Sequence, residues 1–493
     1  MKLTILGGGG FRVPLVYGAL LRDRGEGRVT DVTLYDLDPG RLAAVRRVLT
    51  EQAGRATATG STATGSTAIG DTVTASRAAD STPGGSAGPA STGDPGPAPA
   101  GPAEAPRVTV TTDLDEALRG ADFVFSAIRV GGLEGRAADE RVALAEGVLG
   151  QETVGAGGIA YGLRTVPVAT GIARRIAELA PDAWVINFTN PAGLVTEAMS
   201  RYLGDRVIGI CDSPVGLGRR VARALGADPD RAWLDYAGLN HLGWLHGLRV
   251  AGRDELPRLL ADTRALTSFE EGKLFGADWL RSLGAIPNEY LHYYYFQREA
   301  VRAAQQAPQT RGAFLRDQQR RFYARTEDST TSALDAWNST RAEREATYMA
   351  ENRETAGAGD RAADDLEGGG YEQVALALMR AIARNERATL ILNVRNRATL
   401  GVLDDDAVVE VPCSVDANGA HPVAVSPLPD HATGLVTSVK AVERAVLAAA
   451  GSGSRALAVQ AFALHPLVDS VHIARRLVDG YAAAHPALAH LRH

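Results

Sequence analysis

The feature that most constrains the fold is a run of four glycines between an apolar segment and a helical one. Residues 3–6 are apolar enough for a buried strand, and residues 15–22 have the amphipathic spacing of a helix, with Pro14 in its first turn. A glycine loop in this position lets backbone N–H groups and the helix N-terminus approach a pyrophosphate. The pattern predicts a dinucleotide site, whose contacts we assign to Gly7, Gly8, Gly9, Gly10 and Phe11.

An acidic residue follows the second predicted strand, residues 29–35. At the end of that strand the carboxylate of Asp36 can bind ribose hydroxyls and disfavour a 2′-phosphate, which indicates NAD rather than NADP. Two features depart from the usual fingerprint: Arg12 or Val13 replaces its third glycine, and the spacing to Asp36 is slightly long. A tight glycine turn with a structural aspartate is therefore the alternative interpretation.

Alternating strand and helix patterns predict a Rossmann-like, doubly wound parallel α/β domain over residues 1–212, with five or six strands. Ligands should gather at the carboxyl ends of these strands. Residues 213–493 mix charged helices with β segments and are predicted to form an α+β domain. The further strands of the first domain are expected at residues 107–111, 122–128, 184–188 and 207–210.

One segment, residues 53–105, consists almost entirely of Ala, Thr, Ser, Gly and Pro and contains no aromatic residue. Such a composition cannot offset the entropy lost on ordering, so it predicts a disordered insertion. Regular patterns resume at Arg107, as though the insertion interrupted an intact domain. We therefore expect it to be dispensable for chemistry.

Charge and composition exclude several classes of partner. The 493 residues carry a formal net charge of −6 without a long run of Lys and Arg, which argues against nucleic acid. No apolar run approaches the roughly 20 residues of a membrane span, and the opening residues lack a secretion-signal pattern. We therefore expect a cytoplasmic protein with no membrane partner, in which Cys211 and Cys413 remain free thiols.

A thiol and an imidazole are candidate metal ligands. Cys211 follows a predicted strand, and Ser213 and Pro214 suit the start of the next helix, where a cysteine can have a lowered pKa. One cysteine with His241 makes an incomplete metal site, so substrate oxygens or water would have to complete the shell. A packing cysteine and a structural histidine are the competing interpretation, and spacing alone leaves the choice open.

Two polar segments are candidates for binding substrate. Asn187 and Asn190 end a predicted strand with amides suited to sugar hydroxyls or nicotinamide, although an Asx–Pro turn explains them equally well. Arg129 and Arg136 lie in an arginine-rich stretch directly after another strand, which suits a phosphate group. Surface ion pairing with nearby acidic residues is the competing explanation. The acidic residues concerned are Glu134, Asp139 and Glu140.

Together with the phenol-rich residues 290–295, which alone would suggest an aromatic core stripe, these segments resemble glycoside hydrolase family 4, and most closely its 6-phospho-β-glucosidases. The resemblance implies a Rossmann-like domain followed by an α+β domain, as in lactate and malate dehydrogenases. The matching segments run in family order over nearly the whole chain outside the insertion. They are the glycine loop, Ile128-Arg-Val-Gly-Gly-Leu-Glu, Asp139-Glu-Arg, Gly150-Gln-Glu-Thr, Gly162-Leu-Arg-Thr-Val-Pro-Val, Asn187-Phe-Thr-Asn-Pro-Ala-Gly, Gly209-Ile-Cys-Asp-Ser-Pro, Ala237-Gly-Leu-Asn-His and the Tyr290 cluster.

The resemblance implies an unusual hydrolysis, distinct from the reaction of two carboxylates. In that family NAD removes hydride from carbon 3 of the sugar, and a base then removes the proton on carbon 2 as the aglycone departs. Water adds and the hydride returns, while a divalent metal, typically manganese, acts as Lewis acid. The implied substrate is a 6-phosphorylated disaccharide or aryl glucoside. The implied assembly is a homodimer or homotetramer, with substrate, metal and subunit contacts in the second domain.

The resemblance also assigns roles to residues. Cys211 and His241 become metal ligands, and the base is a tyrosine, which we place at Tyr290 with Tyr294 as the fallback. Asp212 corresponds to a position where members that cleave 6-phospho-α-glucosides carry Asp, proposed to protonate the leaving group, while β-specific members commonly carry Asn. The longer Arg129 and Gln151-Glu-Thr matches are β-like, so we predict the β activity and keep the α activity as the alternative.

Two other classes of function share the predicted nucleotide site. A simple NAD-dependent 2-hydroxy acid dehydrogenase would release NADH stoichiometrically, whereas the family 4 reaction accumulates none. A non-catalytic nucleotide-binding sensor would keep the fold without turnover. Both alternatives are distinguishable by assay.

Overall fold

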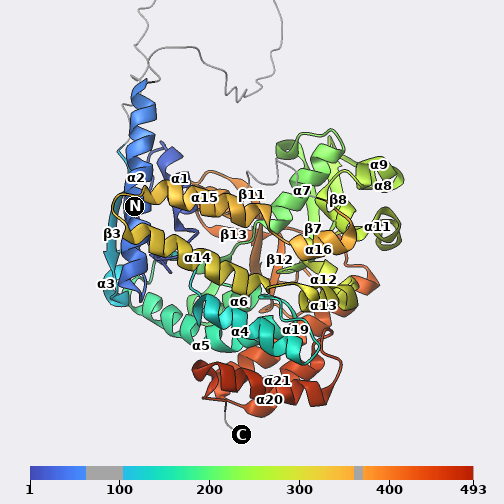
Figure 1. Ribbon diagram of the computed structural model, residues 1–493. Coiled ribbons are helices and arrows are strands. Elements are labelled where there is room, and N and C mark those ends of the chain that lie inside the picture. The colour runs from blue at the N-terminus through green and yellow to red at the C-terminus, as the bar shows by residue number, and fades with distance from the viewer. Residues whose placement is uncertain (63–103, 360–369, 492–493) are drawn as a thin grey trace, which may run out of the picture.

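The computed structural model describes residues 1–62, 104–359 and 370–491. In this part of the chain, a single mixed sheet of thirteen strands runs through the molecule, with helices on both of its faces (Figure 1). Six neighbouring strands, in the order β3-β2-β1-β4-β5-β6, are parallel. These are β1 (Lys2–Leu6), β2 (Asp31–Tyr35), β3 (Arg107–Thr111), β4 (Phe123–Ser126), β5 (Trp184–Asn187) and β6 (Val207–Gly209). The predicted Rossmann-like sheet is confirmed.

The remaining strands extend the same sheet in antiparallel fashion, beginning where β11 pairs with β6. Because the sheet is continuous there, both halves of the chain contribute to the same large apolar cluster, and the division after residue 212 stays a prediction. These strands are β7 (Trp233–Leu239), β8 (Leu242–Val250), β9 (Arg253–Asp254), β10 (Ile286–Pro287), β11 (Ala388–Arg395), β12 (Val408–Asp416) and β13 (Gly419–Pro422).

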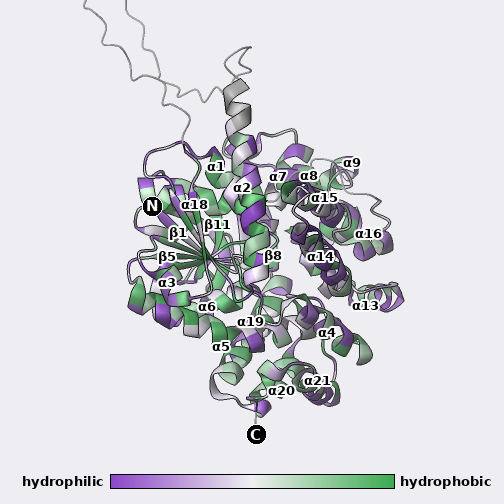
Figure 2. Ribbon diagram, turned by 60° about the vertical axis from the view of Figure 1, so that its left-hand side comes forward, coloured by the Kyte–Doolittle hydropathy of each residue, from purple (hydrophilic) through white to green (hydrophobic). Residues whose placement is uncertain are grey.

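Helices cover the sheet because their apolar residues recur at helical spacing and bury against it. Helices α1, α2 and α18 pack on one face, and α3, α5 and α6 contribute to a second core on the other. Figure 2 shows the strands as the most hydrophobic layer of the molecule. The α-helices of the first half that the structure describes are α1 (Val13–Arg22), α2 (Pro39–Thr62), α3 (Leu114–Leu118), α4 (Gly132–Ala145), α5 (Gly155–Leu179), α6 (Ala192–Leu203) and α7 (Ser213–Ala224).

The second half of the chain is mainly helical. Its long helices α14 and α15 return to pack beside α2 and α4, which brings them to the edge where the parallel strands end. The helices are α8 (Leu256–Ala261), α9 (Thr263–Leu266), α10 (Glu270–Phe275), α11 (Ala277–Leu283), α12 (His292–Tyr295), α13 (Gln297–Gln306), α14 (Arg311–Glu327), α15 (Ala333–Ala346), α16 (Ala350–Ala356), α18 (Tyr371–Arg384), α19 (Asp430–Ser452), α20 (Arg455–Leu464) and α21 (Val471–Ala484).

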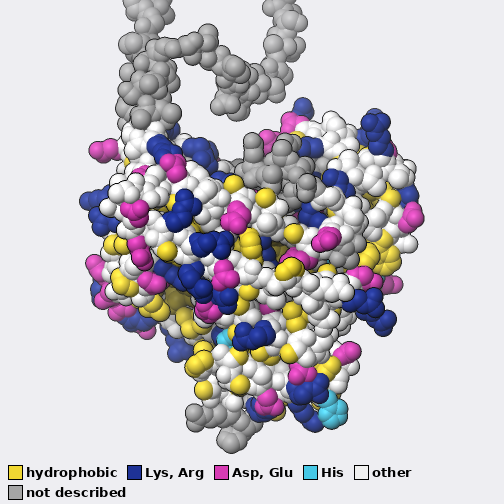
Figure 3. Space-filling model, viewed as in Figure 1, with side chains coloured by type: hydrophobic (Ala, Val, Ile, Leu, Met, Phe, Trp, Pro, Cys, Tyr) yellow, Lys and Arg dark blue, Asp and Glu magenta, His cyan; other side chains and the backbone are white. Residues whose placement is uncertain are grey.

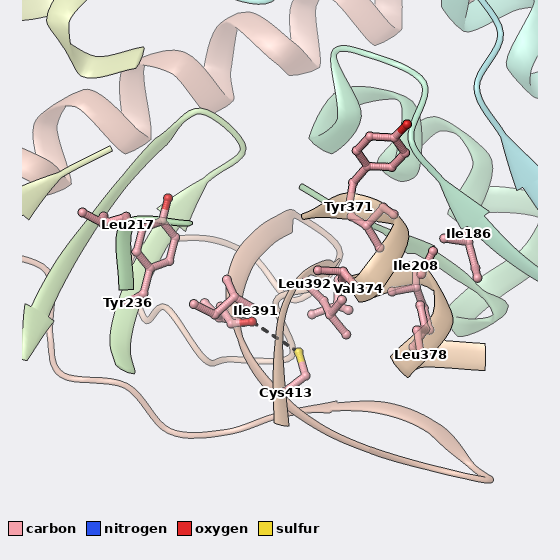
Figure 4. Close-up of a cluster of buried hydrophobic side chains, with 14 of the residues drawn as sticks. Ile186, Ile208, Leu217, Tyr236, Tyr371, Val374, Leu378, Ile391, Leu392 and Cys413 are labelled. Carbon is pink, nitrogen blue, oxygen red and sulfur yellow. Dashed lines mark hydrogen bonds between the residues drawn. The ribbon is translucent and has the colours of Figure 1, made fainter. Parts of the chain in front are cut away.

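The two halves meet in a shared apolar cluster, in which Ile186 and Ile208 of the parallel strands lie with Val374 and Leu378 of α18 (Figure 4). Cys413 of β12 belongs to this cluster, and its thiol donates a hydrogen bond of 3.4 Å to the Val411 carbonyl. Both cysteines are free, as predicted. Burial raises the pKa of the Cys413 thiol to about 12, so this cysteine serves packing.

Helix α2 corrects the predicted start of the insertion at residue 53, because it continues as a helix to Thr62. Its alanines favour the helix, and Arg55 pairs with Asp335 of α15, with Nη1 and Oδ1 2.8 Å apart. Glu51 accepts hydrogen bonds of 3.0 Å from the Ala333 and Leu334 N–H groups at the start of α15. The rest of the predicted insertion, residues 63–103, lies outside the described residues.

The surface carries charge of both signs. On the face shown in Figure 3, basic and acidic side chains are interspersed rather than gathered into one basic field. In the described part of the chain, no helix combines the length and apolar character that a membrane crossing requires.

Candidate active site

A cavity of about 820 Å³ opens at the carboxyl ends of the parallel strands, where α14 and α15 come to lie beside them. Its walls therefore combine loops from the first half of the chain with helices from the second, as expected for a doubly wound sheet. Most of the predicted site residues line it, although they span almost 300 positions. Those that line it are Gly7, Gly10, Phe11, Asp36, Arg129, Arg136, Asn190, Cys211, Asp212, His241 and Tyr290.

Backbone hydrogen bonds within the glycine loop and to the end of β2 fix the conformation of the loop. The N–H groups of Gly7 and Gly8 donate to the Tyr35 carbonyl at 2.9 and 2.7 Å, and Gly10 N–H donates to the Gly7 carbonyl at 2.9 Å. Gly7 has a left-handed φ of 81°, and a Cβ on Gly8 would meet Leu34 Cβ at 2.6 Å, so larger residues do not fit. Gly8 and Gly9 are not among the lining residues.

In the part of the chain that the structure describes, the two residues directly before α1 provide free N–H donors that the glycine loop lacks. Among the described residues, nothing accepts a hydrogen bond from the N–H groups of Phe11 and Arg12, which both line the cavity. Helices of the second half fix these two residues: Trp337 Nε1 donates to the Phe11 carbonyl at 2.8 Å, and Tyr371 Oη donates to the Arg12 carbonyl at 3.0 Å. A pyrophosphate would therefore meet the helix N-terminus rather than the glycine N–H groups.

Asp36 has features of a structural aspartate and of a ribose-binding carboxylate, the two interpretations that the sequence allows. Its Oδ2 accepts a hydrogen bond of 3.0 Å from Gly9 N–H, which is a structural role in the loop. Its Oδ1 accepts one of 3.1 Å from Asp38 N–H, and the carboxylate also lines the cavity. The ribose contact stays a prediction.

Cys211 lies between β6 and α7, as predicted, and is only 5% exposed. Its pKa differs from the expectation: burial raises the pKa of the thiol well above its usual value, and the nearby carboxylates of Glu410 and Asp212 raise it further. Desolvation and negative neighbours outweigh the helix N-terminus here. In the unliganded protein this side chain is therefore a thiol, which must lose its proton to bind a metal.

His241 occupies the turn between β7 and β8 with a left-handed φ of 61°. Its ring stacks on the Tyr290 ring with centroids 3.7 Å apart, and its Nδ1 lies 2.7 Å from Thr153 Oγ1. Burial lowers the pKa of His241 to about 4, so the imidazole is neutral at physiological pH, as a metal ligand must be.

The protein donors fit a divalent metal only in part. Within the described ranges, no three His, Cys, Asp or Glu side chains come together as a metal-holding group. Cys211 and His241 do line the same cavity, together with the amide of Asn190. This donor set agrees with the expectation that substrate oxygens or water would complete the shell.

Tyr290 and Tyr294 are placed differently. Tyr290 lines the cavity, and its hydroxyl lies 3.0 Å from that of Tyr348, which donates to Glu289 Oε1 at 2.8 Å. Burial and the Glu289 carboxylate raise the pKa of Tyr290 well above its usual value. Tyr294 is not among the lining residues and stacks on His465 instead, with ring centroids 6.0 Å apart. Of the two tyrosines, Tyr290 is therefore the one that lines the cavity, and its role as the base stays a prediction.

Asn187 does not line the cavity. Its amide donates to the Thr189 and Ala192 carbonyls at 3.2 Å and to Thr196 Oγ1 at 3.0 Å, which joins the loop that contains the Asn190–Pro191 peptide bond to α6. These bonds give the Asn187 amide a structural role, as the competing interpretation expects of it. Asn190, in contrast, does line the cavity.

The two arginines predicted to bind phosphate already have carboxylate partners. Arg129 and Arg136 both form ion pairs with Glu152, and Arg136 Nε lies 3.0 Å from Glu140 Oε1. Although burial opposes it, these arginines hold the pKa of the Glu152 carboxyl well below its usual range. Surface ion pairing with Glu134, Asp139 and Glu140 is the competing explanation. Arg136 does pair with Glu140, but both residues line the cavity rather than the outer surface.

A second group of arginines in the cavity was missed by sequence reasoning. Arg344 of α15 lies near Arg12 and Arg311, and we call these three residues the Arg344 group. Burial, together with the two positive neighbours, lowers the pKa of Arg344 to about 9. Like charges gathered in a partly buried cavity favour a bound anion. Charged helical sequence is typical of a solvated surface, so no local signal marked these residues.

Comparison with known proteins identifies the family to which the chain belongs. The model of "Family 4 glycosyl hydrolase" matches residues 102–227, and that of "Family 4 glycosyl hydrolase C-terminal domain" matches residues 236–468. The chain therefore belongs to glycoside hydrolase family 4, a class of glycosidases, and the predicted resemblance is confirmed. This membership does not favour the dehydrogenase alternative.

Individual relatives carry both anomeric names. The chain is 34% identical over 393 residues to a Bacillus subtilis protein named "Probable 6-phospho-beta-glucosidase", covering 77% of this chain and 82% of that protein. It is 30% identical over 398 residues to "6-phospho-alpha-glucosidase 1" of Lacticaseibacillus paracasei, covering 77% and 84%. The structure of a Thermotoga maritima 6-phospho-β-glucosidase with manganese, NAD+ and glucose-6-phosphate superimposes with a TM-score of 0.75 at 23% identity, covering 98% of each chain.

Proposed function

We propose that the protein hydrolyses 6-phospho-β-glucosides with NAD and a divalent metal ion, manganese, as cofactors. The observation that carries this proposal is one cavity that unites the glycine loop, the Cys211 and His241 pair, Tyr290 and the Arg344 group. Relatives named for 6-phosphoglucosidase activity support it. Cytoplasmic location and a homodimeric or homotetrameric assembly remain expectations.

In the proposed reaction the chain's own residues bind the reactants and move two protons. The α1 N-terminus and Asp36 hold the dinucleotide, and Cys211 with His241 holds the metal. When bound, NAD supplies hydride transfer at carbon 3 and manganese supplies Lewis-acid stabilisation. Tyr290 removes the proton on carbon 2, and Asp212 protonates the departing oxygen of the aglycone.

Hydrolysis in heavy water tests this function. We expect deuterium on carbon 2 of the sugar product, because the proton removed there exchanges before the product forms. The label is measured by mass spectrometry and NMR, while absorbance follows NADH, which should not accumulate. An unlabelled product would indicate direct displacement, and stoichiometric NADH would indicate a dehydrogenase.

The α activity is the second candidate, and Asp212 favours it. This carboxylate lines the cavity beside Arg12, whose positive charge it faces. The two nitrophenyl 6-phosphoglucosides distinguish the candidates, since their activated leaving groups differ only in anomeric configuration. Faster turnover of the α substrate would replace our choice of the β anomer.

We expect the Arg344 group to bind the 6-phosphate, because a dianion relieves the crowding of positive charges there. Arg344→Met should lower kcat/KM for the phosphorylated substrate about 10- to 100-fold, the equivalent of one charge-assisted hydrogen bond. Arg321→Met, which changes a side chain on α14 that is 62% exposed, is the control and should behave as wild type. Equal loss with phosphorylated and unphosphorylated glucosides would contradict the assignment.

A further inference from the structure

The segment that precedes α5 contacts the candidate metal ligand His241. Thr153 Oγ1 lies 2.7 Å from His241 Nδ1, across 88 positions of the sequence. The same hydroxyl lies 3.0 Å from Gln151 Oε1. Three groups thus form one short chain of hydrogen bonds, which ends on the imidazole.

The identity of the Gln151 oxygen follows from its other partners. Oε1 accepts hydrogen bonds from the N–H groups of Thr153 at 2.6 Å and Val154 at 2.9 Å. An amide NH₂ group in that position would oppose both backbone donors, so the atom must be the oxygen. An amide oxygen only accepts, so in the 3.0 Å hydrogen bond between these two groups the Thr153 hydroxyl is the donor.

A threonine hydroxyl has a single hydrogen. With that hydrogen on the Gln151 bond, Thr153 offers His241 only a lone pair, and this arrangement requires the hydrogen between the two residues to be on Nδ1. In a neutral imidazole the lone pair is then on Nε2, which has no hydrogen-bond partner among the described residues. The left-handed backbone of His241 and its stacking on Tyr290 hold the ring in this orientation.

We propose that Thr153, itself oriented by Gln151, is a positioning residue that fixes His241 in the Nδ1–H tautomer and so presents Nε2 as the metal ligand. This inference rests on the proposed metal site. Partners of this kind orient ligating histidines in many metal sites. It also explains the Gln151-Glu-Thr motif, because Glu152 between them anchors the segment through Arg129 and Arg136.

Manganese binding to the full-length protein tests the proposal without any turnover. Free Mn²⁺ is titrated by electron paramagnetic resonance with wild type, Thr153→Val and Thr153→Ser. Thr153→Val, which keeps the shape and loses the hydroxyl, should weaken Mn²⁺ binding about 10- to 100-fold. Thr153→Ser restores the hydroxyl and should restore the affinity.

Two further variants separate this inference from the proposed function. Thr170→Val makes the same change in α5, where the hydroxyl donates to the Val166 and Pro167 carbonyls of the same helix, and should bind Mn²⁺ as wild type does. If Thr153→Val binds Mn²⁺ as tightly as wild type, the positioning role is wrong while the metal site stands. If wild type does not bind Mn²⁺, or Cys211→Ser binds it equally well, the proposed function itself fails.

The tautomer is measured directly on the wild-type protein, so the test survives a variant that fails to fold. In protein labelled with ¹⁵N-histidine, the His241 resonances are those lost in His241→Gln. We expect hydrogen on Nδ1 in wild type and a mixture of tautomers in Thr153→Val. Hydrogen on Nε2 in the metal-free wild type would overturn the proposal.

Discussion

Tyr290→Phe should lower kcat about 10²- to 10⁴-fold, the range by which a positioned general base accelerates proton transfer. Phenylalanine keeps the ring that stacks on His241 at 3.7 Å and removes only the hydroxyl. Substrate binding should change little, so kcat falls while KM stays close to that of wild type. Steady-state rates with a nitrophenyl 6-phosphoglucoside give both constants.

Tyr294→Phe is the matched control for this experiment. Tyr294 belongs to the same phenol-rich stretch, yet it is outside the cavity lining and stacks on His465. We expect wild-type kcat and wild-type deuterium labelling at carbon 2. The opposite pattern, a silent Tyr290→Phe and an inactive Tyr294→Phe, would move the base to the fallback position.

Asp139→Asn should lower the free energy of unfolding by about 3–5 kcal/mol, because it breaks a buried ion pair and leaves one charge uncompensated. Asp139 of α4 accepts two hydrogen bonds from Arg164 of α5, at 2.8 and 2.6 Å, and both side chains are at most 3% exposed. His485, just after α21, lies 2.8 Å from the same carboxylate. Urea denaturation measures the change.

An exposed ion pair provides the comparison. Asp115 and Arg175 are each 37% exposed, and Asp115→Asn should cost much less stability than Asp139→Asn because solvent screens the pair. Similar losses in the two variants would mean that burial does not determine the strength of the Asp139 pair. Retained stability in Asp139→Asn would show that the C-terminal helices are held by apolar packing alone.

Much of the fold could be predicted because strands and helices have different apolar periods. The six parallel strands follow from these patterns. The insertion was predicted to start too early, since α2 is continued to Thr62 by its alanines and by contacts with α15. Those contacts join residues about 280 positions apart, which composition cannot report.

By itself, the sequence determined the local features: a glycine loop after β1, a cysteine after β6, and motifs specific enough to identify the family. These depend on backbone conformation, which neighbouring residues control. Only the tertiary structure decided which polar groups share the cavity. Arg344 lies near Arg12, Thr153 contacts His241, and the Asn187 amide bonds to Thr196 outside the cavity. The sequence could not report these contacts, because burial and hydrogen-bond geometry depend on segments that meet only when the sheet and helices pack.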